Sequence, residues 1–124
     1  MNNLLAVACG GAIGASLRYG ASLLAVRLFG TGFPFGTLLV NSVGSFCMGA
    51  LYAFTMAADV PPSVKALVGV GMLGALTTFS TFANESVLLM QQGEWGKATL
   101  NILLNVVVCL GMVMLGQQAI STNS

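Results

Sequence analysis

The side chains and backbone best suited to bind an ion are densest in one segment, residues 69–85, which reads GVGMLGALTTFSTFANE. Three glycines within six residues precede a run of hydroxyl and amide side chains that is interleaved with Phe79 and Phe82. This composition favours an unwound backbone, whose freed carbonyls can coordinate a cation and whose freed amides and hydroxyls can donate to an anion. The alternative is an intact helix in which Ser and Thr hydroxyls bond back to carbonyls one turn earlier.

Phe79 and Phe82 are three residues apart, so they share a face wherever this segment is helical. As packing or lipid-facing aromatics they would need no special explanation. The hydroxyls of Ser80 and Thr81 lie between them, however, and the edge of an aromatic ring is positive. The two rings are therefore candidates for the lining of an anion path.

Two other segments carry polar side chains at intervals of four residues, which places each set on one face of a helix. The sets are Thr37, Asn41 and Ser45, and Asn101, Asn105 and Cys109. Polar groups are costly inside an apolar segment, so their positions are informative. Either they hold helices together through interhelical hydrogen bonds, or they line a wet, ion-conducting face; the periodicity leaves both interpretations open.

Two charged residues also lie within apolar segments. Arg18 interrupts the first segment, and its long side chain can reach toward the nearer interface. Glu85 is the one candidate for an intramembrane carboxylate, near the end of the third segment. A structural ion pair or an interfacial anchor is the simplest explanation of each residue.

Membrane helices must position these side chains. The chain has 124 residues, of which 56% are hydrophobic and 6% are charged, and its mean hydropathy is +0.92. A soluble domain carries roughly 25% charged residues. Four apolar runs of spanning length, residues 4–26, 33–58, 64–90 and 95–115, are separated by short connections. The sequence predicts an all-α integral membrane protein in which residues 1–124 form a single domain of four transmembrane helices, the third broken near its middle.

Several classes of function find no support in the sequence. Histidine is absent, the three cysteines lie inside apolar runs, and no spacing typical of metal ligands occurs. The net charge of +1 provides no electrostatic footprint for nucleic acid. No catalytic triad or phosphate loop is visible, so we expect that the chain is not an enzyme.

The distribution of basic residues says little about which way up the chain inserts. Short loops rich in Lys and Arg normally remain in the cytoplasm. Here Lys65 belongs to one side of the membrane, whereas Arg27 and Lys97 belong to the other. So small a bias permits insertion in both orientations. An antiparallel homodimer, with a two-fold axis in the membrane plane, then becomes possible.

Three segments together resemble the Fluc/CrcB family of bacterial fluoride channels. They are GGAIGASLRYG (residues 10–20), GTLLVNSVGSFCMG (residues 36–49) and GMLGALTTFSTFANE (residues 71–85). The four-span layout and the length match over nearly the whole chain, and TTFSTF after a glycine-rich stretch is the most specific piece. The resemblance implies a channel of the bacterial cytoplasmic (inner) membrane that exports toxic fluoride passively, with two pores in each antiparallel, dual-topology homodimer. Its partners would be fluoride, a second copy and membrane lipid.

The resemblance also implies which residues form the fluoride pore. Two aromatic rings, one side-chain amide on the second helix and further polar groups would line it. These residues would be Phe79, Phe82, Asn41, Ser80, Thr81 and Asn105. The chain departs from the family pattern in the fourth span, where Asn101, Asn105 and Cys109 stand in place of an aromatic hydroxyl and serines. The roles of Asn101 and Cys109 are therefore left unassigned.

A sodium ion at the dimer centre is the one cofactor that the resemblance implies. The backbone carbonyls of Gly74 and Thr77, at the break in the third helix, would hold it as a structural ion. Arg18 would lie towards a vestibule, and Glu85 would have a vestibule or structural role.

Two other functions belong to different classes. A small multidrug transporter is also a short four-span chain, but it would need a carboxylate in the first span, and this first span has none. A non-transporting assembly subunit is the third interpretation. Ion flux from purified protein in liposomes distinguishes all three.

Overall fold

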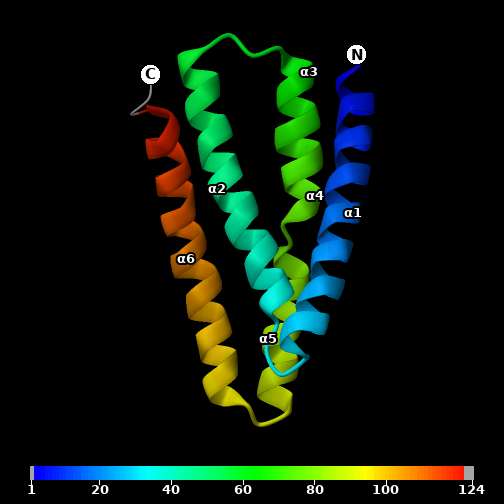
Figure 1. Ribbon diagram of the computed structural model, residues 1–124, viewed down its shortest axis with the longest axis vertical. Helices are drawn as coiled ribbons and strands as arrows, with labels where there is room; N and C mark the ends of the chain where they lie inside the picture. The colour runs from blue at the N-terminus through cyan, green and yellow to red at the C-terminus, as the bar shows by residue number, and fades with distance from the viewer. Residues whose placement is uncertain (1, 122–124) are drawn as a thin grey trace.

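The computed structural model describes residues 2–121, and within them the chain is helical, with no strand. Four stretches are long and apolar enough to cross a membrane: Asn3–Phe29, Phe35–Ala57, Pro62–Gln91 and Trp95–Ile120. They run up and down. The start of the first span, the end of the last span and the loop between the second and third spans therefore lie at the same end of the molecule (Figure 1). The predicted four-helix architecture is confirmed.

The first span is helix α1 (Asn3–Phe29), and the second is α2 (Phe35–Ala57). Asn2 is the N-cap of α1, and its side-chain oxygen accepts a hydrogen bond from the Leu4 amide at 2.7 Å. Gly30 ends it with φ 77°, a conformation that suits glycine. Helix α1 thus extends beyond the predicted end at residue 26. Arg27, which we expected in the loop, lies in the last turn of α1. A cation at this position interacts favourably with the helix dipole.

The third span consists of several pieces. It begins with α3 (Pro62–Val64), the π-helix η1 (Lys65–Leu73) and α4 (Gly74–Leu76). Thr77 (φ −82°, ψ 157°) and Thr78 (φ −152°, ψ 121°) are extended, and α5 (Phe79–Gln91) follows. Figure 1 shows these two residues as a thin link between α4 and α5. The fourth span is α6 (Trp95–Ser121), which a turn at Gly93 with φ 79° joins to α5.

Glycines let the helices pack in two close pairs. Helix α1 packs along η1, and α2 packs along α6. A Cβ atom on Gly14 would overlap the Met72 carbonyl oxygen, and one on Gly49 would overlap the Val113 carbonyl oxygen. Small residues at such crossings allow the backbones of membrane helices to approach closely. The two crossings bring the backbone of α1 close to η1 and that of α2 close to α6.

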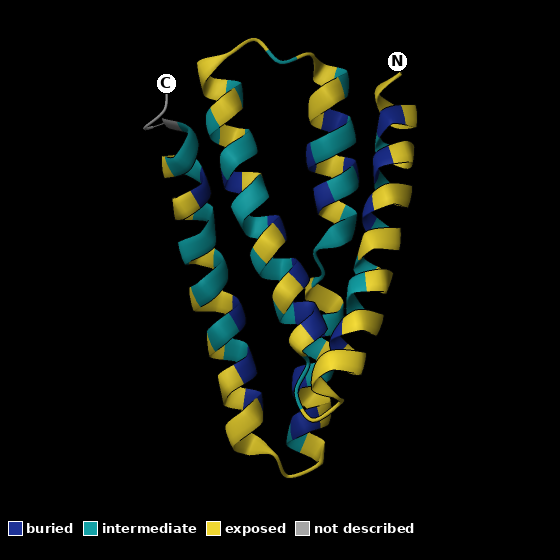
Figure 2. Ribbon diagram, viewed as in Figure 1, coloured by how far each residue is buried: buried dark blue, intermediate teal, exposed yellow. Residues whose placement is uncertain are grey.

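Burial in this molecule is inverted relative to a soluble protein. Many large apolar side chains are exposed on the outside of the helices, among them Leu4, Tyr19 and Leu110. Figure 2 shows exposed residues along the outer side of every span. The buried polar side chains among the described residues are Thr37, Ser86, Asn101 and Asn105. Large apolar side chains therefore face the surroundings, while Ser86, Asn101 and Asn105 make hydrogen bonds inside the bundle.

Candidate functional site

The interruption of the third span opens on a cavity of about 330 Å³. Six of the residues that line it come from α2, the interruption itself, α5 and α6. They are Asn41, Thr77, Thr78, Phe79, Phe82 and Asn105. Ser45 and Cys109 extend the lining along α2 and α6. None of the described residues that line this cavity is charged.

Asn41 binds the interruption from α2. Its Oδ1 accepts a hydrogen bond from the Thr78 amide at 2.8 Å, and its Nδ2 donates to the Thr78 carbonyl at 3.1 Å. Nδ2 also donates to Asn105 Oδ1 on α6 at 3.0 Å. One half-buried amide therefore ties α2, α6 and the extended segment together, so the polar stripe on α2 does form interhelical hydrogen bonds.

Phe79 and Phe82 meet edge to face within the cavity lining. Their ring centroids lie 5.5 Å apart, and the ring planes form an angle of 62°. Phe82 is only 8% exposed, whereas Phe79 is 78% exposed. The inner ring is therefore fixed by packing, whereas the outer ring contacts Phe82 but is otherwise largely exposed. This arrangement turns a positive ring edge toward a neighbouring ring face.

Ser80 and Thr81 do not line this cavity with the rings. Ser80 is exposed, and Thr81 is half-buried. The Thr81 amide donates to Thr78 Oγ1 at 3.2 Å, which makes Thr78 the N-cap of α5. The cap of α5 therefore uses the hydroxyl of Thr78, which precedes the two rings, and from between the rings only the main-chain amide of Thr81.

The carbonyls of Gly74 and Thr77 lose the donors that a continuous helix would supply. The Thr78 amide, which would bond the Gly74 carbonyl, donates to Asn41. The Thr81 amide, which would bond the Thr77 carbonyl, donates to the Thr78 hydroxyl. Arg18 on α1 reaches the same place, where its Nε donates to the Ala75 carbonyl at 3.0 Å.

These carbonyls are suitable ligands for a hard cation. Unwound backbone carbonyls coordinate sodium in other membrane proteins. Among residues 2–121, no group of three or more His, Cys, Asp or Glu side chains could hold a metal ion. A cation at the interruption would therefore depend on main-chain oxygens.

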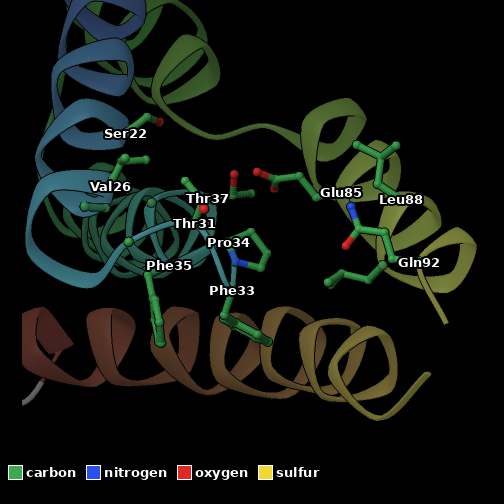
Figure 3. Close-up of a pocket in the computed structure, with 14 residues that line it drawn as sticks. Ser22, Val26, Thr31, Phe33, Pro34, Phe35, Thr37, Glu85, Leu88 and Gln92 are labelled. Atoms are coloured by element: carbon green, nitrogen blue, oxygen red, sulfur yellow. The ribbon is translucent and has the colours of Figure 1, made fainter. Parts of the chain in front are cut away.

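A second cavity, of about 240 Å³, lies near the α1–α2 connection. In Figure 3, Thr37 from α2 and Glu85 from α5 point toward one another across it. The Oε1 atom of Glu85 is buried and has no hydrogen-bond partner. Thr37 therefore lies in a different cavity from Asn41 and Ser45, although the three share one face of α2.

Asn101 and Ser86 lie behind the lining of the larger cavity. Asn101 is 0% exposed, and its Nδ2 donates to Ser86 Oγ at 2.9 Å. Ser86 was not singled out by the sequence patterns. The signal that could have found it is its place on the buried face of α5, four residues after Phe82 and three before Leu89.

A family model described as "CrcB-like protein, Camphor Resistance (CrcB)" matches residues 5–117. The chain belongs to the CrcB family. A curated CrcB-family relative from Shewanella amazonensis, named "Fluoride-specific ion channel FluC", is 64% identical over 120 residues, or 97% of each chain. Relatives of the same name from Shewanella frigidimarina and Shewanella baltica are 61% and 59% identical over the same share of each chain.

Membership of the CrcB family agrees with the resemblance that the three segments carry. With its four spanning helices, the chain is a multi-pass integral membrane protein, which in bacteria lies in the inner membrane. The relatives are named as ion channels and not as enzymes, which confirms the expectation that this CrcB-family chain is not an enzyme.

Proposed function

We propose that this chain is a fluoride-selective channel that lets toxic fluoride leave the cell passively, down its electrochemical gradient. The observation that carries the proposal is that Asn41, Phe79 and Phe82 line one cavity at the helix interruption. The name of the 64% identical relative, a fluoride-specific ion channel, supports the choice of ion.

The chemistry of the cavity suits a small, strongly hydrated anion. A selective pore must replace the water around fluoride with close donors, and the amide groups of Asn41 and Asn105 can donate once an anion displaces their present acceptors. Conduction also needs binding that is weak enough for release. The described lining carries no Lys or Arg, whose fixed charge would hold the anion longer. Ring edges of Phe79 and Phe82 add weak positive potential. Ser80 and Thr81 would supply further polar groups close to the aromatics.

The working unit is an antiparallel, dual-topology homodimer with two pores. The 78% exposure of Phe79 supports this, because a pore aromatic needs a second wall that one chain does not supply. Basic residues on the two sides of the bundle are nearly balanced, with Lys65 starting η1 and Arg27 and Lys97 near the opposite end. A chain with so small a bias can insert both ways up.

A structural sodium ion is held at the dimer centre by the Gly74 and Thr77 carbonyls. Two carbonyls are too few to replace the hydration shell of a bare cation, so equivalent carbonyls of the second copy complete the site. The ion would neutralise the partial negative charge where the ends of the two α4 helices approach each other. Arg18 supports the same segment from the vestibule side, and Glu85 with Thr37 borders the second cavity.

Fluoride efflux from liposomes that contain the purified protein tests the proposed function. We expect rapid fluoride loss and no chloride loss under the same gradient. Absence of fluoride efflux from well-folded protein would favour a non-transporting subunit. Export of organic cations would favour a small multidrug transporter, although α1 contains no carboxylate to couple such export.

A further inference from the structure

The hydrogen bonds behind the larger cavity all point in one direction. Asn41 Nδ2 donates to Asn105 Oδ1, and Asn105 Nδ2 donates to Asn101 Oδ1, each at 3.0 Å. Asn101 Nδ2 then donates to Ser86 Oγ, and Ser86 Oγ donates to the Phe82 carbonyl, each at 2.9 Å. This directed chain begins at a cavity-lining amide and ends on the backbone of a cavity-lining aromatic.

Only part of the directed chain is in contact with the cavity. Asn41, Asn105 and Phe82 line it, but Asn101 and Ser86 do not. Asn101 is 0% exposed, and Ser86 is 4% exposed. These two residues therefore cannot reach an ion in the cavity directly. Any effect they have on the ion must act through the groups that they hold.

Asn101 decides which end of the Asn105 amide faces Asn41. Asn105 Nδ2 donates both to Asn101 Oδ1 at 3.0 Å and to the Asn101 main-chain carbonyl at 2.9 Å. With its nitrogen held there, Asn105 turns its oxygen toward Asn41. Ser86 fixes Asn101 in turn, because the Ser86 hydroxyl accepts from Asn101 Nδ2.

This orientation leaves Asn41 without a free donor. An amide nitrogen carries two hydrogens. One of those on Asn41 goes to the Thr78 carbonyl and the other to Asn105 Oδ1. The Asn105 oxygen therefore occupies the acceptor position that an anion would take against Asn41. An anion must displace it, and the more firmly Asn105 is held, the more displacement costs.

We propose that Ser86 and Asn101 form a positioning pair that sets the anion affinity of the cavity by holding Asn105 with its oxygen toward Asn41. This inference rests on the proposed function, because it concerns the same cavity. Loosening the pair frees the Asn105 amide to turn its nitrogen toward the anion. Removal of either residue therefore strengthens anion binding, while loss of packing alone would only reduce the number of working channels.

The test measures fluoride efflux from liposomes over a range of fluoride concentrations for the full chain and for three variants. Asn101→Leu removes the side-chain acceptor and keeps similar bulk. We expect it to lower the half-saturating fluoride concentration about three- to tenfold, which is the change in affinity that the net free energy of one hydrogen bond produces. Ser86→Ala should shift it in the same direction by less. Ser86→Thr keeps the hydroxyl and should restore the wild-type value.

Ser16→Ala is the matched control for Ser86→Ala. The Ser16 hydroxyl makes the same kind of bond, to the Ala12 carbonyl at 2.7 Å, but it lies on an exposed face and does not belong to the directed chain. We expect wild-type behaviour from it. The double variant Ser86→Ala with Asn101→Leu should match Asn101→Leu alone, because both changes act through Asn105.

An unchanged half-saturating concentration in both Asn101→Leu and Ser86→Ala, with only fewer active liposomes, would overturn the positioning role. Should Asn101→Leu fail to fold, Ser86→Ala against Ser86→Thr decides the question alone. A wild-type protein without fluoride efflux would overturn the proposed function instead, so the two failures are distinguishable.

Discussion

The side-chain amide of Asn41 binds both main-chain polar groups of Thr78, accepting from its N–H at 2.8 Å and donating to its C=O at 3.1 Å. The two residues lie 37 positions apart in the chain. The Asn41 amide thus replaces the hydrogen bonds that Thr78 would make in a continuous helix. This pairing stabilises extended backbone within a membrane span, where unwound backbone is tolerated only if its polar groups find partners.

We expect Asn41→Leu to destabilise the protein by about 2–4 kcal/mol, because two partly buried main-chain groups of Thr78 lose their partners. Fluoride efflux should be lost as well. Thermal unfolding in detergent measures the first effect. A variant that melts like the wild type would show that Thr78 finds other partners and that Asn41 does not hold the interruption.

Phe79→Ile and Phe82→Ile separate packing from contact with the anion. Ile keeps similar apolar bulk, and substitutions that conserve volume usually cost less than about 1.5 kcal/mol. If the ring edges meet fluoride, each change should abolish most of the efflux while the size-exclusion profile stays unchanged. Phe→Met should retain part of the flux, because the thioether is polarisable. Wild-type flux in both Ile variants would assign the rings to packing alone.

Gly14→Ala should lower the free energy of unfolding by about 1–3 kcal/mol or more. The added Cβ would overlap the Met72 carbonyl and push α1 away from η1. Gly11→Ala is the matched control, since nothing in this chain lies within 4 Å of a Cβ placed there. Thermal unfolding of the two variants side by side measures the difference. Equal melting temperatures would mean that the close approach of α1 to the third span contributes little.

Three lysines added to the 59–63 loop should lock the chain in one orientation, with that loop in the cytoplasm. Activity should fall when this variant is expressed alone. A second variant, locked the opposite way by lysines beside Lys97, should restore activity when the two are expressed together. Cysteine accessibility that found every wild-type copy in one orientation would contradict dual insertion.

Exchange of sodium for a bulky organic cation during purification should lower the stability of the dimer, because the Gly74 and Thr77 carbonyls would lose their shared ion. Return of sodium should restore it. Size-exclusion chromatography during slow exchange follows the effect without any flux measurement. A dimer that keeps the same lifetime after complete exchange would argue against an ion at this place.

The number and extent of the membrane spans could be predicted from the sequence because they depend on local composition. Apolar runs near 20 residues long are required by the thickness of the bilayer, whichever helices pack together. The ends were less predictable: α1 continues through Arg27 to Phe29, since the glycine that stops it comes only at Gly30. The family could be predicted from three segments together, residues 10–20, 36–49 and 71–85.

The arrangement within the site was decided by the tertiary structure. Periodicity placed Thr37, Asn41 and Ser45 on one face of a helix. It could not show that Thr37 lies opposite Glu85 at the smaller cavity, while the other two residues line the larger cavity. Likewise, Asn101 and Asn105 share a face, yet only Asn105 lines the cavity.

Which residues are polar within each span can thus be read from the sequence alone, whereas which of them meet depends on how the helices pack. Spacing along one helix sets the direction of its side chains relative to each other. Contacts such as Asn41 with Thr78, or Asn101 with Ser86, depend on the rotation and depth of two helices. The rotation and depth of each helix depend on how it packs against its neighbours, as in the close glycine crossings of α1 with η1 and of α2 with α6. No single helix encodes such packing.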